Sequence, residues 1–254
     1  MGQACGMGTD DAPRAPIARF KELCLDTRPV DGVGVTALSG FWAAALGLEQ
    51  QFFGEPGDPE DGGDVVGLEE GQNIAICPVP EAKTVKHRVH LDVNVASLDE
   101  LTSLGATILR PQDDEIRWTI MADPEGGEFC AFVRPPEKLV PYRAFEVVVD
   151  AVDAEAVTRW WAEVFGVEVR HEDGQDWWWI EDVPGFPSTA VAPEFAMVFG
   201  DVPEPKTVKN RMHWDVYGNV EDFLARGATQ LWEMERWTVL ADPEGNEFCV
   251  FPPG

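Results

Sequence analysis

The sequence has few basic residues and lacks the segments that would tie it to a membrane or an export route. Its 254 residues include 46 acidic and 19 basic side chains, so the formal net charge is −27. This charge argues against binding to nucleic acid or to anionic membranes, because both would repel it. No run approaches the roughly 18 apolar residues of a membrane helix, and residues 1–18 lack the basic and apolar regions of a secretory signal. We therefore expect a cytoplasmic protein with a disordered arm at residues 1–18.

Cysteine is also scarce, and its spacing indicates no stabilising framework. The five cysteines are odd in number, and no Cys-x-x-Cys pair occurs, so neither a disulfide network nor a zinc knuckle is predicted. Three of them, Cys77, Cys130 and Cys249, are interpreted as small buried hydrophobic side chains. What the chain does have is apolar surface to bury, since 44% of it is hydrophobic, with 14 Phe and 10 Trp. This composition predicts a folded core rather than a disordered chain.

The sequence contains an internal duplication. KTVKHRVHLDV at 83–93 recurs as KTVKNRMHWDV at 206–216, and MADPEGGEFCAF at 121–132 recurs as LADPEGNEFCVF at 240–251. A duplication of this length predicts two similar domains. We place them at residues 19–135 and 143–254, joined by a Pro-rich, charged linker at residues 136–142.

Within each repeat the pattern predicts a strand, a helix and further strands, twice over. In the second repeat, residues 145–151 are β-branched and indicate a strand. Residues 153–166 have helical spacing, a possible N-cap at Asp153 and a C-terminal glycine at Gly166. The repeated Asp-Pro-Glu-Gly sequence predicts a tight turn into the strand Glu-Phe-Cys. Strand alternation then places four pairs of residues on shared faces: Glu128 with Cys130, Glu247 with Cys249, His90 with Asp92, and His213 with Asp215.

The repeated sequences FWAAALG and WWAEVFG, KTVK-x-R-x-H-x-D and DPEG-[GN]-EFC together resemble the vicinal oxygen chelate superfamily. This superfamily contains glyoxalase-like, bleomycin-resistance-like and extradiol-dioxygenase-like proteins, and the resemblance to its actinobacterial glyoxalase-like branch covers nearly the whole chain. It implies an α+β fold of two tandem glyoxalase-like domains. Each domain is expected to be a pair of βαβββ modules forming a cupped, eight-stranded sheet.

The resemblance also implies divalent-metal ligands on the first, fourth, fifth and eighth strands of such a pair. Matching the family positions gives one histidine and two glutamates in each repeat: Glu22, His90 and Glu128 in the first, and Glu146, His213 and Glu247 in the second. The fourth-strand ligand stays open between Gln72 and Cys77 in the first repeat, and between Phe195 and Gly200 in the second. We expect the second repeat to be the working domain.

A Glu–His–Glu set is coherent metal chemistry. Two carboxylates neutralise a divalent ion, the imidazole adds a borderline ligand, and open positions remain for a substrate with two oxygens. The ion is expected to be Fe, Mn, Ni, Zn or Mg, acting as a Lewis acid in enolisation, isomerisation or ring opening. The alternative interpretation is structural: strand histidines often serve as hydrogen-bonding groups, and glutamates beside a turn are commonly solvated.

Tryptophan is concentrated in the second repeat, which holds eight of the ten. On a strand, Trp177 and Trp179 point one way and Trp178 the other, while Trp214 flanks His213. Trp177, Trp179 and Trp214 are therefore candidates for stacking on a planar ligand. The competing interpretation is that most of these rings fill the core and the contact between domains.

Two functions follow from these residues. The first is a metal-dependent lyase, isomerase or ring-cleaving enzyme acting on a small oxygen-rich molecule, with no catalytic residue assigned beyond the metal ligands. The alternative is a metal-free protein that sequesters an aromatic antibiotic or metabolite. The expected partner in both is a small molecule, bound by a monomer with two pseudo-symmetric domains or by a homodimer.

Overall fold

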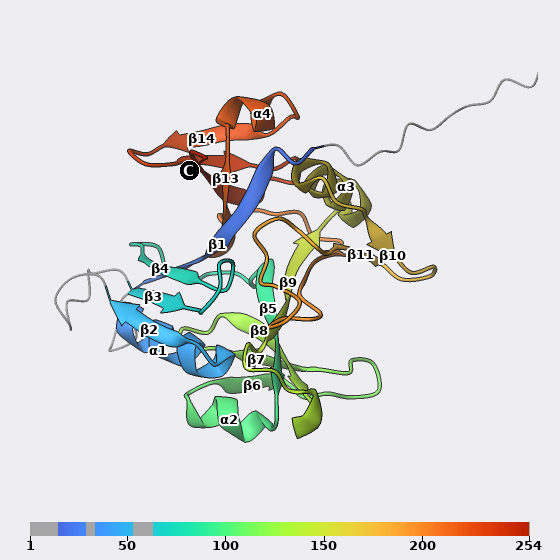
Figure 1. The fold of residues 1–254 in the computed structure, drawn as a ribbon. Coiled ribbons are helices and arrows are strands. Elements are labelled where there is room, and N and C mark those ends of the chain that lie inside the picture. The colour runs from blue at the N-terminus through green and yellow to red at the C-terminus, as the bar shows by residue number, and fades with distance from the viewer. Residues whose placement is uncertain (1–14, 29–33, 53–62, 254) are drawn as a thin grey trace, which may run out of the picture.

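A computed structural model of the chain describes residues 15–28, 34–52 and 63–253. Its elements form four modules with one order, a strand followed by a helix and three further strands (Figure 1). In the first repeat these are β1 (Ala18–Thr27), α1 (Val35–Leu46), β2 (Glu49–Phe52), β3 (Gly63–Val66), β4 (Ile74–Pro78), β5 (Val89–Val95), α2 (Leu98–Ser103), β6 (Thr107–Arg110), β7 (Thr119–Ala122) and β8 (Glu128–Val133). In the second they are β9 (Ala144–Ala151), α3 (Ala154–Phe165), β10 (Arg170–His171), β11 (Trp177–Ile180), β12 (Ala196–Asp201), β13 (Met212–Gly218), α4 (Val220–Leu224), β14 (Thr229–Glu233), β15 (Thr238–Ala241) and β16 (Glu247–Phe251).

The strands form two eight-stranded sheets, and each sheet takes one module from each repeat. The first and fourth modules form the β1–β13 sheet, in the order β14-β15-β16-β13-β1-β4-β3-β2. The second and third form the β5–β9 sheet, in the order β10-β11-β12-β9-β5-β8-β7-β6. The α+β class with two eight-stranded sheets is therefore confirmed. The two modules of residues 19–135, however, do not pair with each other, and neither do those of residues 143–254. Each repeat instead contributes one module to one sheet and its other module to the other sheet.

The ends of the predicted segments fall partly outside the described residues. Of the arm at residues 1–18, the first fourteen lie outside them. Ile17 already donates its backbone N–H to the carbonyl of Val164 in α3, at 2.9 Å, and β1 begins at Ala18. In the linker, a 3₁₀ turn spans Pro136–Lys138, while Tyr142 is buried. Among the described residues, the helices are all too short or too polar to cross a bilayer.

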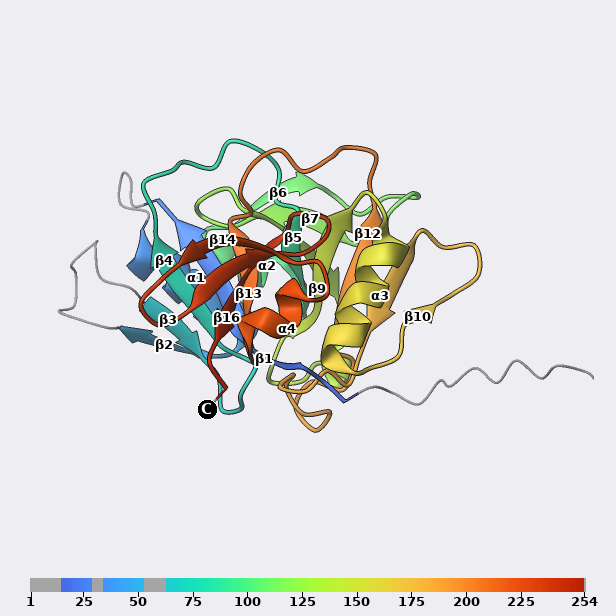
Figure 2. The same cartoon turned by 90° about the horizontal axis from the view of Figure 1, so that it is seen from above.

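The helices α1 and α3 pack their aromatic side chains on the sheets and form the core. As predicted, α3 begins at the N-cap Asp153, whose carboxylate accepts the N–H of Ala156 at 2.9 Å, and ends at Gly166 with φ of 67°. Trp161 of α3 lies edge-on to Trp214, with ring centroids 5.1 Å apart. Trp42 of α1 is likewise buried and faces edge-on to Phe129, at 5.2 Å. Figure 2 shows α3 running beside β12.

The Asp-Pro-Glu-Gly turns join these helices to the strands. Asp242 accepts the backbone N–H groups of Glu244 and Asn246 with one oxygen, and the indole N–H of Trp161 with the other, at 3.0 Å. Asp123 does the same in the first repeat. Burial raises the pKa of each aspartate to about 6. The turns are therefore fixed to the core, and this accounts for the aspartate in both copies.

The glutamate of each turn connects the two sheets. Glu244 precedes β16, and its carboxylate accepts the N–H groups of Val152 and Asp153 after β9, each at 3.0 Å. In the symmetric position, Glu125 accepts the N–H of Arg28 and a guanidinium N–H of Arg211, each at 2.8 Å. These contacts tie each turn to the opposite sheet, which the sequence alone did not indicate.

The two repeats differ at one pair of contacting positions, and this difference gives a stability prediction. In the second repeat, Asn210 donates to Asn246 at 3.0 Å, and the first repeat has His87 and Gly127 at these positions. A Cβ on Gly127 would lie 2.6 Å from the His87 ring. Gly127→Asn should therefore destabilise the fold by about 1–3 kcal/mol through overpacking. Adding His87→Asn should recover more than about 1 kcal/mol, because the pair then matches the other repeat. Urea unfolding of the singles and the double checks this, and simple additivity would contradict it.

Candidate functional site

The chemically active side chains lie on the face of each sheet that is turned away from α1 and α3, here called the cup face. In the β1–β13 sheet, Trp214 and Phe248 pack on α3. Because side chains alternate along a strand, His213, Asp215 and Cys249 must point to the opposite face. The register pairs Cys24 of β1 with His213, and Asp215 with both Glu22 of β1 and Cys249 of β16. The two central strands and β16 thus bring these residues together.

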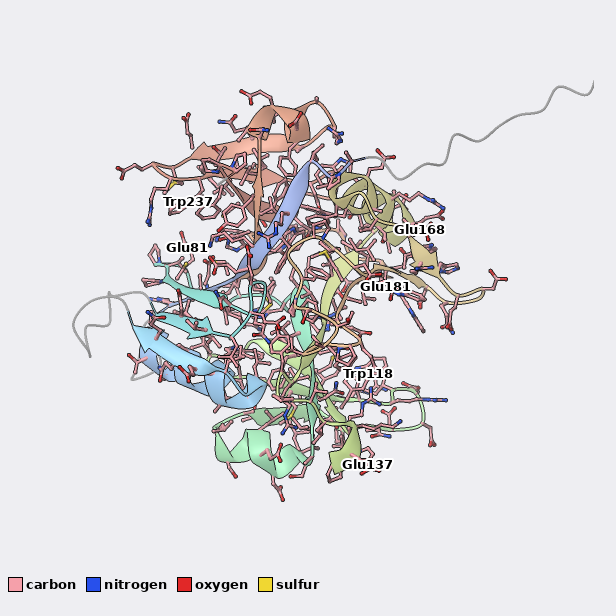
Figure 3. All side chains as sticks on the ribbon, in the orientation of Figure 1. Glu81, Trp118, Glu137, Glu168, Glu181 and Trp237 are labelled. Carbon is pink, nitrogen blue, oxygen red and sulfur yellow. The ribbon has the colours of Figure 1, made fainter. Side chains whose placement is uncertain are left out.

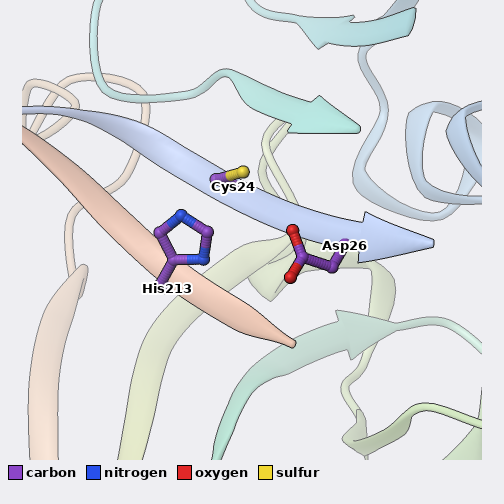
Figure 4. Close-up of side chains that lie close together, drawn as sticks. All are labelled: Cys24, Asp26 and His213. Carbon is purple, nitrogen blue, oxygen red and sulfur yellow. The ribbon is translucent and has the colours of Figure 1, made fainter. Parts of the chain in front are cut away.

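The distances confirm a compact cluster on this face, which we call the thiol cluster: Cys24, Cys77, His213, Asp215 and Cys249. The Sγ of Cys249 lies 3.5 Å from Nε2 of His213, and the Sγ atoms of Cys24 and Cys77 are 3.3 Å apart. Ligand atoms of His213, Asp215 and Cys249 all lie within 4.8 Å of one another. Those of Cys24, Asp26 and His213 do so as well, and Figure 4 shows the imidazole ring beside the other two side chains. His213 belongs to both groups.

Cys24 and Cys249 of the thiol cluster are buried, whereas Cys77 is only half-buried, which corrects its predicted burial. The polar atoms of the cluster are not all hydrogen-bonded. His213 and Asp215 are each 5% exposed, yet Nδ1 of the histidine and Oδ1 of the aspartate have no hydrogen-bond partner. Burial lowers the pKa of His213 to about 3. Burial also raises the pKa of Asp215 to about 7, although the positive charge of Lys21 acts to lower it. Buried polar atoms in native proteins nearly always have partners. A water molecule or a bound group would give these two atoms a partner, as it would Oδ1 of Asp92 in the other sheet.

The equivalent face of the β5–β9 sheet carries a related but different set. His90 Nε2 lies 3.6 Å from both Cys130 Sγ and Asp92 Oδ1. Asp92 pairs in register with Glu146. The pKa of Asp92 is raised well above its ordinary value, chiefly by burial and next by the negative charge of Glu146. The register places Val148 opposite His90, where the other sheet has Cys24. Both sites thus keep a His-x-Asp strand beside a cysteine, but the β1–β13 sheet is richer in thiols.

The six predicted ligands are divided between the sheets in a way that corrects their grouping. Glu22, His213 and Glu247 belong to the β1–β13 sheet, and Glu146, His90 and Glu128 to the β5–β9 sheet. The expected working set of Glu146, His213 and Glu247 is therefore split, because β9 pairs with β5 and not with β13. Glu22 forms an ion pair with Lys21 at the edge of the thiol cluster.

The two glutamates at the start of β8 and β16 are occupied by structural contacts. Glu247 accepts from Nζ of Lys206 at 2.7 Å and from the backbone N–H of Asn210 at 3.1 Å. Glu128 likewise accepts from Lys83 at 2.9 Å and from the N–H of His87 at 3.0 Å. Each carboxylate therefore anchors the KTVK segment of its own repeat. The cysteine two residues later, on the same strand face, reaches the histidine instead.

A substitution tests this structural role. Glu247→Gln leaves Lys206, only 12% exposed, without its counter-charge. We expect a loss of about 3 kcal/mol in the free energy of unfolding, which is typical of a broken buried ion pair. Glu128→Gln is the matched control and should cost less, because that pair is 18–20% exposed. Urea midpoints measure both. Loss of metal binding without loss of stability would instead identify Glu247 as a ligand.

The three predicted ligand-stacking tryptophans have different positions. Trp214 is fully buried against α3, so it cannot contact a ligand on the cup face, and that prediction was wrong. Trp179 pairs with Val198, which pairs with Val148, so it shares the cup face of the β5–β9 sheet with His90. Trp177 lies on the same face and is 39% exposed. Trp118 and Trp237, labelled in Figure 3, stack on Phe132 and Phe251, in β8 and β16.

A pocket of about 790 Å³ lies between the two KTVK segments, and most of its lining residues fall in the ranges 79–88 and 204–211. Equivalent residues of the two repeats line it, including the ion pairs of Lys86 with Asp150, at 2.8 Å, and of Lys209 with Asp26. Asp26 also belongs to the group with Cys24 and His213. The pocket thus adjoins the thiol cluster at one end.

Comparison with known proteins places this geometry in context. A family model described as a glyoxalase-like domain matches residues 23–132 and again 146–251. Glyoxalase I from Zea mays has a similar structure, with a TM-score of 0.58, 10% sequence identity and 92% of each chain covered. A candidate dioxygenase from Bacillus subtilis gives a TM-score of 0.61 at 11% identity, covering 94% of this chain and 86% of that one. At these identities the structures support the fold alone. The sequence has no significant match among curated proteins.

Proposed function

We propose, since this chain belongs to the glyoxalase-like domain family of the vicinal oxygen chelate superfamily, that it is a metal-dependent enzyme acting on a small oxygen-rich molecule. The reaction class is lyase, isomerase or ring cleavage, and the working centre is the cup face of the β1–β13 sheet. One observation carries the proposal. His213 and Asp215 are buried beside two thiols, and each keeps a polar atom without a partner.

The side chains present fit a divalent metal ion. His213 would hold it with Asp215 and Cys249 on one side, or with Cys24 and Asp26 on the other, since each group offers three ligand atoms within 4.8 Å. Three protein ligands leave coordination positions for a substrate. Once bound, such an ion supplies a Lewis acid that polarises a carbonyl or hydroxyl oxygen.

The chain's own side chains would bind and orient the substrate. Lys21 lies 3.9 Å from Asp215 and 4.6 Å from the centre of the Phe251 ring. Its ammonium group has three donors, so it can hold a substrate oxygen while it pairs with Glu22. Phe251 and Trp237 stack at 5.5 Å and provide an apolar wall that excludes water from one side.

We place substrate entry at the central pocket. Asp26 lines this pocket and belongs to the group around His213, so a molecule in the pocket is next to the cluster. The Asp26–Lys209 ion pair stands between the two, and Lys209 is 43% exposed. Both sheets are built within a single chain, which is consistent with action as a monomer. Four free thiols in the described residues favour a reducing compartment, and we assign the cytoplasm.

The test begins with metal analysis of the protein purified without a histidine tag. Small dicarbonyl, hydroxycarbonyl and catechol compounds are then incubated with it, and products are measured by mass spectrometry. We expect conversion of at least one class, loss of conversion with EDTA, and recovery with added metal. Conversion that is insensitive to EDTA would contradict metal dependence.

Binding without conversion would favour sequestration of an aromatic molecule instead. Such sequestration would use Trp177 and Trp179, which lie on the cup face of the β5–β9 sheet. If Trp177→Ala abolishes binding of a ligand that is never converted, and if EDTA leaves the binding unchanged, the enzyme proposal fails.

A further inference from the structure

We propose that the pocket between the two KTVK segments binds a small organic anion that carries a flat aromatic ring, such as an aryl carboxylate. Trp232 of β14 would contact the ring, and Lys86 and Lys209 would bind the anionic group. The inference rests on the proposed function only in taking this pocket as the route to the cup face, and it names the class of molecule admitted. Binding in the pocket itself requires neither a metal ion nor turnover.

The KTVK sequence presents the same two side chains to the pocket in both repeats. The first lysine of each copy, Lys83 or Lys206, forms an ion pair with the glutamate that begins β8 or β16. The valine and the second lysine of each copy line the pocket. Val85 and Val208 are 43% and 41% exposed, so packing in the core does not account for a valine at this position. An apolar ligand in the pocket would account for it in both copies.

Trp232 adds a flat apolar surface from one repeat only. It lies on the outer strand β14, is 49% exposed and lines the same pocket as the two exposed valines. The equivalent residue of the first repeat is Arg110, which follows the same register shift in its strand and forms ion pairs with Asp113 and Glu115, at 2.8 and 2.6 Å. A planar ring can stack on the indole and bury apolar area there. The single tryptophan therefore predicts one ring and one orientation in the pocket.

The charge of the lining favours an anion. Five of the chain's 19 basic side chains line the pocket, together with four of its 46 acidic ones, so the pocket is more positive than a chain of net charge −27 would have on average. Lys86 and Lys209 are 56% and 43% exposed, and each forms an ion pair with one carboxylate, of Asp150 or Asp26. An ammonium group has three donors. The donors that remain can therefore bind the carboxylate of a ligand.

Isothermal titration calorimetry of the full chain, treated with chelator and dialysed into metal-free, low-salt buffer, tests the inference. The probes are 2-naphthoate, its neutral analogue 2-naphthalenemethanol, and inorganic phosphate, which has the charge without the ring. The volume of about 790 Å³ is within the range of small-molecule sites, about 300–1,000 Å³, and admits all three. We expect one site for 2-naphthoate, with an affinity at least about tenfold higher than for either other probe and lowered by added salt. These comparisons use the wild-type protein alone.

Substitutions then locate the site. Trp232→Ala should weaken 2-naphthoate binding by about tenfold, because it removes the aromatic contact. Trp177→Ala is the matched control, since Trp177 is 39% exposed on the other sheet, and it should leave the affinity unchanged. Lys86→Gln should also weaken binding by about tenfold, whereas Lys86→Arg, which keeps the positive charge, should retain most of the affinity. Circular dichroism checks that each variant is folded.

Three results would overturn the inference: equal affinity for 2-naphthoate and either other probe, equal losses in the two tryptophan variants, or binding that appears only after a metal ion is added. Metal-free binding of 2-naphthoate, with no turnover of any compound in the substrate screen, would support the inference while removing the proposed function. Turnover in that screen without any binding of 2-naphthoate would do the reverse.

Discussion

The His213→Ala variant is expected to lose turnover by about a thousandfold or more. His213 is the residue shared by both ligand groups of the β1–β13 sheet, so its removal takes one donor from either arrangement. Lewis-acid stabilisation is worth several kcal/mol, and about 1.4 kcal/mol corresponds to a factor of ten in rate. The measurement is kcat/KM on the best compound of the substrate screen, together with metal content.

His90→Ala provides the matched control for that prediction. His90 occupies the same strand position in the β5–β9 sheet and has the same cysteine contact, but it lacks the second and third thiols. We expect its turnover to stay within a few-fold of wild type. Equal losses in the two variants would mean that both sheets catalyse, and a larger loss in His90→Ala would move the working centre to the other sheet.

The isolated first repeat, residues 1–138, is expected not to fold as a native monomer. In the intact chain, β1 pairs with β13 and β5 pairs with β9, so the fragment loses the central partner of both its sheets. Two modules with unpaired edges and half-covered apolar faces are poor independent units. We expect weak near-ultraviolet circular dichroism and no cooperative urea transition for this fragment alone.

Mixing completes the test. When residues 1–138 and 139–254 are refolded together, they should form a one-to-one complex with the spectrum of the intact protein, because each fragment supplies the missing modules. The cut follows Lys138, which is exposed. A compact, cooperatively unfolding monomer of the first fragment would show that β1 can pair with β5 instead, and the prediction would then be wrong.

The sequence predicted the modules but not their pairing, for a physical reason. β5 and β13 share the sequence His-x-Asp-Val, and an arginine precedes each strand, so both offer β1 a similar edge. In the structure, Glu22 meets Asp215, and Glu146 meets Asp92. These pairs have the same composition, so they do not distinguish the two arrangements. Which modules pair therefore depends on how whole modules pack, and a short sequence motif does not specify that packing.

The site was predicted in part. His213 and Asp215 could be placed on one strand face by alternation alone, and so could Glu247 and Cys249. Alternation does not say which member of the second pair reaches the histidine, because that depends on the parallel register of β13 and β16. Cys24 and Cys77 lie on strands about 50 residues apart, with nothing in their local sequence to mark them. Their contact is visible only once β1 and β4 are paired.

The exchange of modules between repeats has a consequence for the order in which the protein is made. The second and third modules are consecutive, so the β5–β9 sheet has all its strands once residue 201 has left the ribosome. β1 is made first, yet it waits for β13, at Met212–Gly218, with one edge unpaired. A nascent chain therefore matures from its middle outwards, and its N-terminal strand is the segment most open to chaperones or aggregation. Since His213 lies on β13, the metal site of the proposed function can be completed only when synthesis is nearly finished.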